Sequence, residues 1–183
     1  MEAFSDLTFV GYGAVIRNLS PDEDALGVTV LVNVIGSGGQ ILESEADRYD
    51  AIPATGTYYA GGLVLINQGN ASVARLEVSV SFRERAKKAI TLPLVSNVRV
   101  QADAVGIAEV AGELQNTSTK PLSSLSDVTA VVFDAAGNVL GGGWGFLEAD
   151  VPPGARIGFT VSIAGRSPSE IASAQVSVEP NFD

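Results

Sequence analysis

An internal repeat with a spacing of about one hundred residues constrains this sequence more than any other feature. Five short matches recur in the same order: Asn18 to Ser20 with Asn116 to Ser118, Val28-Thr29 with Val128-Thr129, Ile52 to Gly56 with Val151 to Gly154, Leu63 and Leu65 with Val161 and Ile163, and Val78 to Val80 with Val176 to Val178. One match can arise by chance, but five in order indicate a duplicated unit. We therefore predict two homologous domains, residues 1–88 and 89–183, each long enough to bury its own core.

The clearer copy carries a β-hairpin signal. Residues 128–133 are rich in β-branched and aromatic side chains, and residues 134–138 supply Asp and Gly for a tight turn before the apolar run restarts. Gly141 to Gly143, just ahead of Trp144, indicate a bulge or a place where another backbone comes close. Short strands with frequent turn signals, and almost no helical periodicity, predict an all-β fold built of β-sandwiches.

The segment between the two copies is short and charged. Arg83 to Lys88 holds four of the eleven basic residues, and the connector from Arg83 to Leu94 is not rich in Gly and Ser. We expect a restricted hinge there. The basic run is either a docking patch for an acidic partner or lipid head group, or a solvated connector whose charges protect a strand edge from pairing. Residues 83–89 and 167–172 could each form a single helical turn at most, the second with Ser169 as its cap.

The second copy resembles the FxLYD-type immunoglobulin-like domains of bacterial and archaeal exported proteins and lipoproteins. The resemblance is carried by residues 112–116, 128–140 and 151–159. The sequence departs from the family at Ala130, where a Phe is usual, and the first copy has Val34 in place of Asp134. The resemblance implies two tandem immunoglobulin-like β-sandwich domains that serve as an extracellular interaction or spacer module.

Composition excludes several kinds of chemistry. The chain has no cysteine and no histidine, so disulfides, thiolate or imidazole metal sites, a Cys nucleophile and a Ser-His-Asp triad are excluded. The net charge of −10 argues against nucleic acid or an anionic membrane as a partner. No apolar stretch approaches the ~20 residues of a membrane-spanning helix. We expect no cofactor.

Two cellular locations are compatible with the sequence. The first residues, Met1 to Asp6, lack the pattern of a signal peptide. The protein is therefore either cytoplasmic, or extracellular or bound to the cell envelope as a mature chain whose export segment was removed. The resemblance favours the second location, with any lipid anchor lying outside these residues.

Acidic loop residues are candidate calcium ligands, because calcium takes several oxygen ligands. Asp22, Glu23 and Asp24 are the first choice, with Asp47 and Asp50 as further candidates. The spacing is not that of an EF-hand loop, and the alternative is a solvated acidic loop.

Five carboxylates could in principle supply the pair that glycoside hydrolysis needs: Glu43, Glu45, Asp47, Glu148 and Asp150. Equivalent positions in separate domains do not make one active site, so we predict no enzymatic activity. Asn18, Asn70 and Asn116 match the N-glycosylation pattern, but a structural Asn at a strand end explains the repeated pair better.

Aromatic residues are the candidate binding surface. Trp144, Phe146, Tyr58 and Tyr59 could recognise carbohydrate, since a Gly-rich segment can expose a flat ring. The alternative is that the single Trp lies in a sandwich core.

These observations predict a non-enzymatic interaction, adhesion or spacer module of an exported or cell-surface bacterial protein, with a protein or a cell-envelope glycan as its partner. A carbohydrate-binding or accessory module of a surface enzyme is the alternative, and an exposed Trp144 beside a groove would favour it. A third hypothesis is a cytoplasmic assembly protein whose exposed strands pair with a partner.

Overall fold

The computed structural model describes residues 7–69, 71–87 and 90–181, and its regular structure is almost entirely β. The described residues form twelve strands: β1 (Thr8–Arg17), β2 (Asp24–Gly36), β3 (Ile41–Ile52), β4 (Thr57–Ile66), β5 (Val73–Ser81), β6 (Glu84–Ala86), β7 (Leu94–Ala102), β8 (Ala108–Gln115), β9 (Asp127–Phe133), β10 (Val139–Phe146), β11 (Arg156–Ile163) and β12 (Ser173–Glu179). The predicted fold class is confirmed. The described part of the chain contains no helix with the length and apolar character needed to cross a bilayer.

The strands form two β-sandwiches, one from each copy of the repeat. In the second sandwich, the sheet β7-β8-β11 faces the sheet β10-β9-β12, with every pair antiparallel. This is the A-B-E and C′-C-F strand order of an immunoglobulin-like sandwich. The first sandwich repeats it with β1-β4 facing β3-β2-β5, and β6 continues alongside β2 after β5. Among the described residues, the first sandwich has no counterpart of β7.

Each sandwich has a hydrophobic core of its own. The first core gathers inward-facing residues from β1 to β4, including Tyr12, Val30 and Tyr58. The second gathers residues from β8 to β12 and their loops, including Leu114, Val132 and Phe159. Alternate residues along each strand face inward, as the period-2 patterns predict. Full burial of one such side chain contributes about 1.5–3 kcal/mol to the free energy of folding.

The repeated asparagines hold equivalent corners of the two sandwiches. Asn116 Nδ2 donates to the carbonyls of Lys120 and Val151, both at 2.8 Å, and its Oδ1 accepts from Ser118 N at 2.9 Å. Asn18 does the same in the first copy, with carbonyls of the Glu23 and Ile52 segments. Both side chains are buried. The structural interpretation of these two residues is confirmed, while Asn70 lies outside the described residues.

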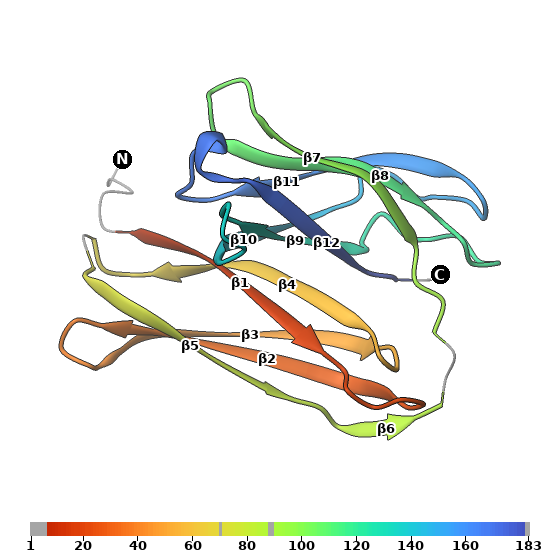
Figure 1. Cartoon of the computed structure of the whole chain (residues 1–183), viewed down its shortest axis with the longest axis horizontal. Helices are drawn as coiled ribbons and strands as arrows, with labels where there is room; N and C mark the ends of the chain where they lie inside the picture. Colours follow the sequence, from red (N-terminus) through yellow and green to blue (C-terminus); the bar gives the residue numbers. More distant parts are fainter. Residues whose placement is uncertain (1–6, 70, 88–89, 182–183) are drawn as a thin grey trace.

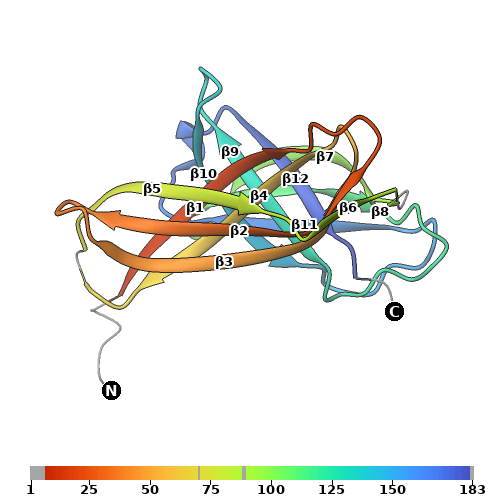
Figure 2. The ribbon, with the colours of Figure 1, turned by 90° about the horizontal axis from the view of Figure 1, so that it is seen from below.

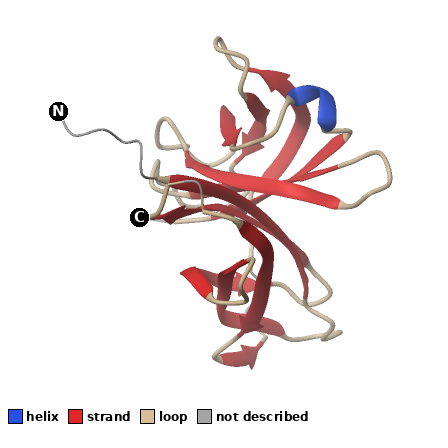
Figure 3. Cartoon of the chain, turned by 90° about the vertical axis from the view of Figure 1, so that its left-hand side faces the viewer, coloured by secondary structure: helices blue, strands red, loops and turns tan. Residues whose placement is uncertain are grey.

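The two sandwiches pack face to face, so that four sheets are stacked in layers (Figures 1 and 3). The outer face of β1-β4 lies on the outer face of β10-β9-β12. Seen from below, β2, β3 and β5 lie in front of β1 and β4 (Figure 2). The connector therefore joins two docked bodies.

Glycines form the centre of the interface between the sandwiches. A Cβ on Gly61 would overlap the carbonyl oxygen of Ala130, and one on Gly13 would overlap that of Gly141. A Cβ on Gly142 would lie 2.6 Å from the carbonyl oxygen of Tyr12. The two backbones are therefore in direct contact. Both expectations for residues 141–143 are confirmed, because the β9–β10 register also shifts between Val139 and Gly141.

The two segments with weak helical signals differ from each other in the structure. Glu84 to Ala86 form β6, and Lys88 and Ala89, at the predicted domain boundary, lie outside the described residues. Pro168 to Glu170 form one 3-10 turn, as predicted, but Ser167 is its cap. The prediction of Ser169 was wrong, because Pro168 begins the turn and leaves the preceding residue to accept from its amides.

Candidate functional site

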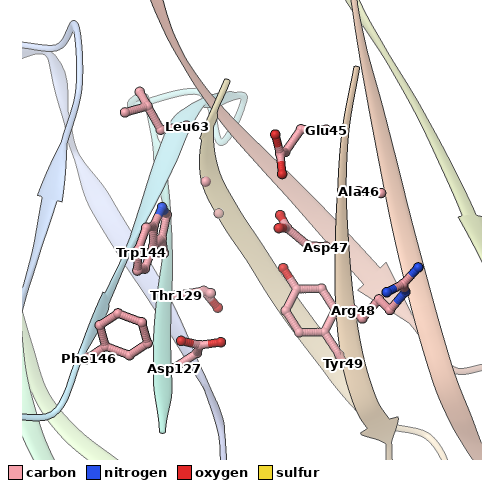
Figure 4. Close-up of a pocket in the computed structure, with 12 residues that line it drawn as sticks. Glu45, Ala46, Asp47, Arg48, Tyr49, Leu63, Asp127, Thr129, Trp144 and Phe146 are labelled. Atoms are coloured by element: carbon pink, nitrogen blue, oxygen red, sulfur yellow. The ribbon is translucent and has the colours of Figure 1, made fainter. Parts of the chain in front are cut away.

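A groove of about 460 Å³ lies where the two sandwiches meet (Figure 4). One wall comes from β10 of the second sandwich and carries Trp144 and Phe146. The opposite wall comes from β3 of the first sandwich and carries Glu45, Asp47 and Tyr49. The floor is formed by residues 61–62 of β4 together with Asp127 and Thr129 of β9. Gly61 and Gly62 contribute only backbone atoms to this floor.

The sequence of β10 explains why its aromatic side chains face the groove. Gly143 points into the second sandwich, where a Cβ would overlap the carbonyl oxygen of Ser162 on β11. Because side chains alternate along a strand, Trp144 and Phe146 lie on the other face. Each is 49% exposed, and their rings meet edge to face with centroids 5.1 Å apart. The alternative of a core Trp is wrong: the β10 positions that face the core are glycines packed closely against β11, and Trp144 lies on the opposite face of the sheet.

Tyr58 and Tyr59 do not join this aromatic pair. Tyr58 is buried in the first core, where its ring lies 4.3 Å from that of Tyr49. Tyr59 lies in the interface: its N–H donates to Ser177 Oγ at 2.9 Å, and its carbonyl accepts from Thr129 Oγ1 at 2.7 Å. The structure therefore divides the four predicted aromatic residues into two that face the groove and two that hold the fold.

The carboxylates of the groove have altered acidity. Burial raises the pKa of Asp47, and the nearby Asp127 raises it further. Burial also raises the pKa of Asp127 itself. Glu45 and Asp47 were considered as acidic residues from the sequence, but Asp127 was missed. Its only sequence signal is its place at the start of a strand, and nothing local reveals that β3 of the other copy lies opposite.

The groove can therefore present the flat face of one aromatic ring and several hydrogen-bond acceptors to one ligand. Aromatic faces suit the C–H faces of a ring, and carboxylates accept strong hydrogen bonds from hydroxyl or ammonium groups. Arg48 is the one basic residue among those that line the groove. Figure 4 shows its side chain turned away from the space between Trp144 and Asp47.

The acidic loop of the first copy is not assembled as a metal site. Asp24 is buried, and its Oδ1 accepts from Ala54 N at 2.9 Å. Asp22 forms an ion pair with Lys87. Within residues 7–69, 71–87 and 90–181, no group of three or more acidic side chains is arranged to hold a metal ion. Of the other carboxylates named from the sequence, Glu45 and Asp47 lie together on the β3 wall of the groove, whereas Asp150 accepts from Ser124 N at 2.7 Å.

A partly buried carboxylate also lies between the sandwiches. Glu179 Oε1 accepts from Asp50 N at 2.7 Å, which links β12 to β3. Burial raises the pKa of Glu179 to about 7, although the Asp50 hydrogen bond opposes the shift. A carboxylate pKa above its unfolded value means that the folded state binds the proton more tightly. Stability therefore falls as pH rises from about 4.5 through about 7.

Replacing Glu179 with Gln should stabilise the protein at alkaline pH. The amide oxygen can still accept from Asp50, and the cost of burying a charge disappears. We expect a gain of roughly 2 kcal/mol in the free energy of unfolding at pH 8 and little change at pH 4.5. Denaturant unfolding at both pH values measures this gain in the free energy of unfolding, and Glu148→Gln, at an exposed position, is the control. An equal gain at both pH values would contradict the charge-burial explanation.

Comparisons with known proteins do not assign this chain to a family. No protein-family model matches the chain, and no curated protein matches it. The FxLYD-type resemblance therefore stays a prediction. Solved structures with similar architecture include red sea bream transglutaminase (12% identity, TM-score 0.33) and an exo-chitosanase of Amycolatopsis orientalis (15% identity, TM-score 0.31). The matches cover 98% of this chain but 27% and 26% of those chains, so it spans about a quarter of their length. Likeness at this level concerns β-sandwich architecture alone.

Proposed function

We propose that this protein is a non-enzymatic binding module of an exported or cell-surface bacterial protein, and that it binds carbohydrate in the groove between its sandwiches. The observation that carries the proposal is the pair of half-exposed rings, Trp144 and Phe146, on one wall of that groove. A large apolar residue exposed beside a concave, partly polar surface is the usual arrangement of a ligand site. The FxLYD-type resemblance of the second copy supports the proposed extracellular or cell-envelope location of the protein.

The chemistry of the two walls defines the class of sugar. The ring of Trp144 stacks against a pyranose face and Phe146 supports that ring edge to face, while Glu45, Asp47 and Asp127 accept hydrogen bonds from hydroxyl or ammonium groups. Uronic acids and sulfated sugars place like charges against these carboxylates and should bind poorly. Neutral sugars and amino sugars of a cell envelope are therefore the proposed ligands.

The role of Trp144 can be tested directly. Trp144→Ala should weaken binding to the preferred oligosaccharide by about tenfold or more, which corresponds to the ~1.4 kcal/mol that one stacked ring can supply. Because half of the ring is already exposed, the thermal midpoint should change little. Titration calorimetry follows an initial screen of neutral, cationic and anionic oligosaccharides.

The matched control is Phe9→Ala, which removes another exposed aromatic ring that does not line the groove. It should leave sugar binding unchanged. The proposal would be overturned if no neutral or amino sugar bound, or if Phe9→Ala and Trp144→Ala weakened binding equally.

A spacer role is the second candidate, and the backbone-to-backbone interface favours it. Two sandwiches docked through glycines cannot slide past each other without separating, so they hold their ends at a fixed distance. A protein that binds no sugar but keeps one compact shape in solution would support this role.

A further inference from the structure

The two sandwiches differ by one strand, and the difference leaves part of the first sandwich uncovered. In the second sandwich, β7 pairs with β8 and lies against β12. Among the described residues of the first sandwich, no strand pairs with the corresponding edge of β1, and none lies over β5. Figure 2 shows β5 on the side of the body away from β3, so the uncovered face and the free edge of β1 adjoin each other.

Equivalent valines show the effect of the missing strand. Val78 and Val80 pair in register with Val32 and Val30, which are fully buried, so all four side chains point to the inner side of their sheet. Even so, Val78 is 43% exposed and Val80 is 47% exposed. Val178, which the repeat aligns with Val80, is 4% exposed. Inner-facing residues of β5, together with Phe82 just beyond it, thus form an open strip.

The neighbouring strand β1 shows the same pattern. Its inner-facing Val10 and Ile16 are only partly buried, whereas the repeat aligns them with Ala108 and Leu114 of β8, which pairs with β7, and both of these are fully buried. The inner-facing residues of both β1 and β5 are therefore more exposed than their counterparts in the second sandwich. An unpaired strand edge beside an apolar strip has the geometry that accepts an added strand.

We propose that the first sandwich accepts a β-strand from a partner polypeptide. The strand pairs antiparallel with the free edge of β1 and lays alternate apolar side chains on the open strip. β7, which fills the equivalent place in the second sandwich, indicates the chemistry of the partner strand. It is nine residues long, and its Val95, Val98 and Val100 pack against the second core. The ligand is thus an extended segment of similar length, with apolar residues at intervals of two or three.

The second sandwich shows how such a strand is held. There β7 runs antiparallel along the edge of β8 that corresponds to the free edge of β1, and it also lies against β12. A partner's strand in the first sandwich would make the same two contacts, one with β1 and one with β5.

A peptide with the sequence of β7, Leu94 to Ala102, is the probe. It carries a fluorescent label, and the comparison peptide has the same composition with its apolar residues made consecutive. Fluorescence anisotropy with the complete 183-residue chain should show at least about tenfold tighter binding of the β7 peptide. Hydrogen exchange should slow at the amides of β1, and hence locate the peptide at the free edge.

Substitutions separate this site from other surfaces. Val80→Glu should weaken peptide binding by about tenfold or more, whereas Val139→Glu, at another half-exposed valine, should leave it unchanged. Trp144→Ala should also have no effect, so this site and the sugar groove can fail independently. The proposal is overturned if the two peptides bind alike, if protection appears at β8 instead of β1, or if the unliganded chain forms a dimer that Val80→Glu abolishes.

Discussion

Gly61→Val is expected to separate the two sandwiches while leaving each one folded. Any side chain at this position would overlap the carbonyl oxygen of Ala130, and the amide of Gly143 lies 2.8 Å from the same point. Both obstacles are backbone atoms held in the middle of a sheet, so they cannot turn aside. Overpacking of a closed interior costs about 1–3 kcal/mol even where side chains can adjust. Here no side chain is available to adjust, and the sheets must move apart.

Each sandwich should survive that separation, because neither core borrows residues from the other copy. Val also suits a strand, so the local conformation of β4 is not opposed. We expect unchanged far-ultraviolet circular dichroism, a larger radius of gyration by small-angle scattering, and two unfolding transitions in place of one. Sugar binding should be lost, since the two walls of the groove come from different sandwiches.

Gly158→Val provides the matched control. Gly158 is an exposed strand residue of β11, and the nearest atom to an added Cβ is the Gly112 carbonyl oxygen at 3.9 Å, an ordinary contact distance. This variant should keep the compact shape and a single transition. A compact Gly61→Val protein with intact sugar binding would show that the interface does not depend on backbone contact.

Asn116→Ala is expected to cause the second large effect, a loss of about 3 kcal/mol in the free energy of unfolding. The substitution removes the partner of two carbonyls, those of Lys120 and Val151, and of the Ser118 amide. Asn116 is completely buried, so water cannot readily replace these bonds. Each buried group left without a partner costs about 1–3 kcal/mol. Urea unfolding of the full chain measures the change.

Two comparisons sharpen that result. Asn18→Ala removes the equivalent bonds from the first copy and should cost a similar amount, because both side chains hold the same corner. Asn138→Ala removes one exposed bond to Asp134 and should cost less than about 1 kcal/mol. If Asn116→Ala were as mild as Asn138→Ala, the corner would not depend on its side chain.

The sequence was informative where structure is decided locally. The corner asparagines, the Pro-Gly turns and the β-branched residues of β9 act over a few residues, and they were enough to predict the duplication and the all-β fold. The glycine run before Trp144 was correctly taken as a site of close backbone approach. Which backbone approaches was not predictable, because Gly13 and Gly61 carry no side chain and so give no periodic signal.

The groove depends on the contacts between the two copies, and that is why sequence analysis found only part of it. Trp144 and Phe146 were named because aromatic residues beside glycines attract attention. Asp127 and the carboxylates of β3 become neighbours only when two sheets from different copies face each other. The uncovered β5 was also unpredictable, since Val78 and Val80 alternate in the same way as the partly buried Val176 and the buried Val178.

The glycine-lined interface also shapes how such a protein can evolve. At most positions in a protein, a substitution can make a side chain either larger or smaller, and a neighbour can compensate in the opposite direction. Gly13, Gly61 and Gly142 are already the smallest residues, and the atoms that they touch are mainly backbone atoms. Every substitution there enlarges the side chain, and no neighbour can shrink in response. Mutational drift at this surface therefore leads in one direction, toward two sandwiches joined only by their connector.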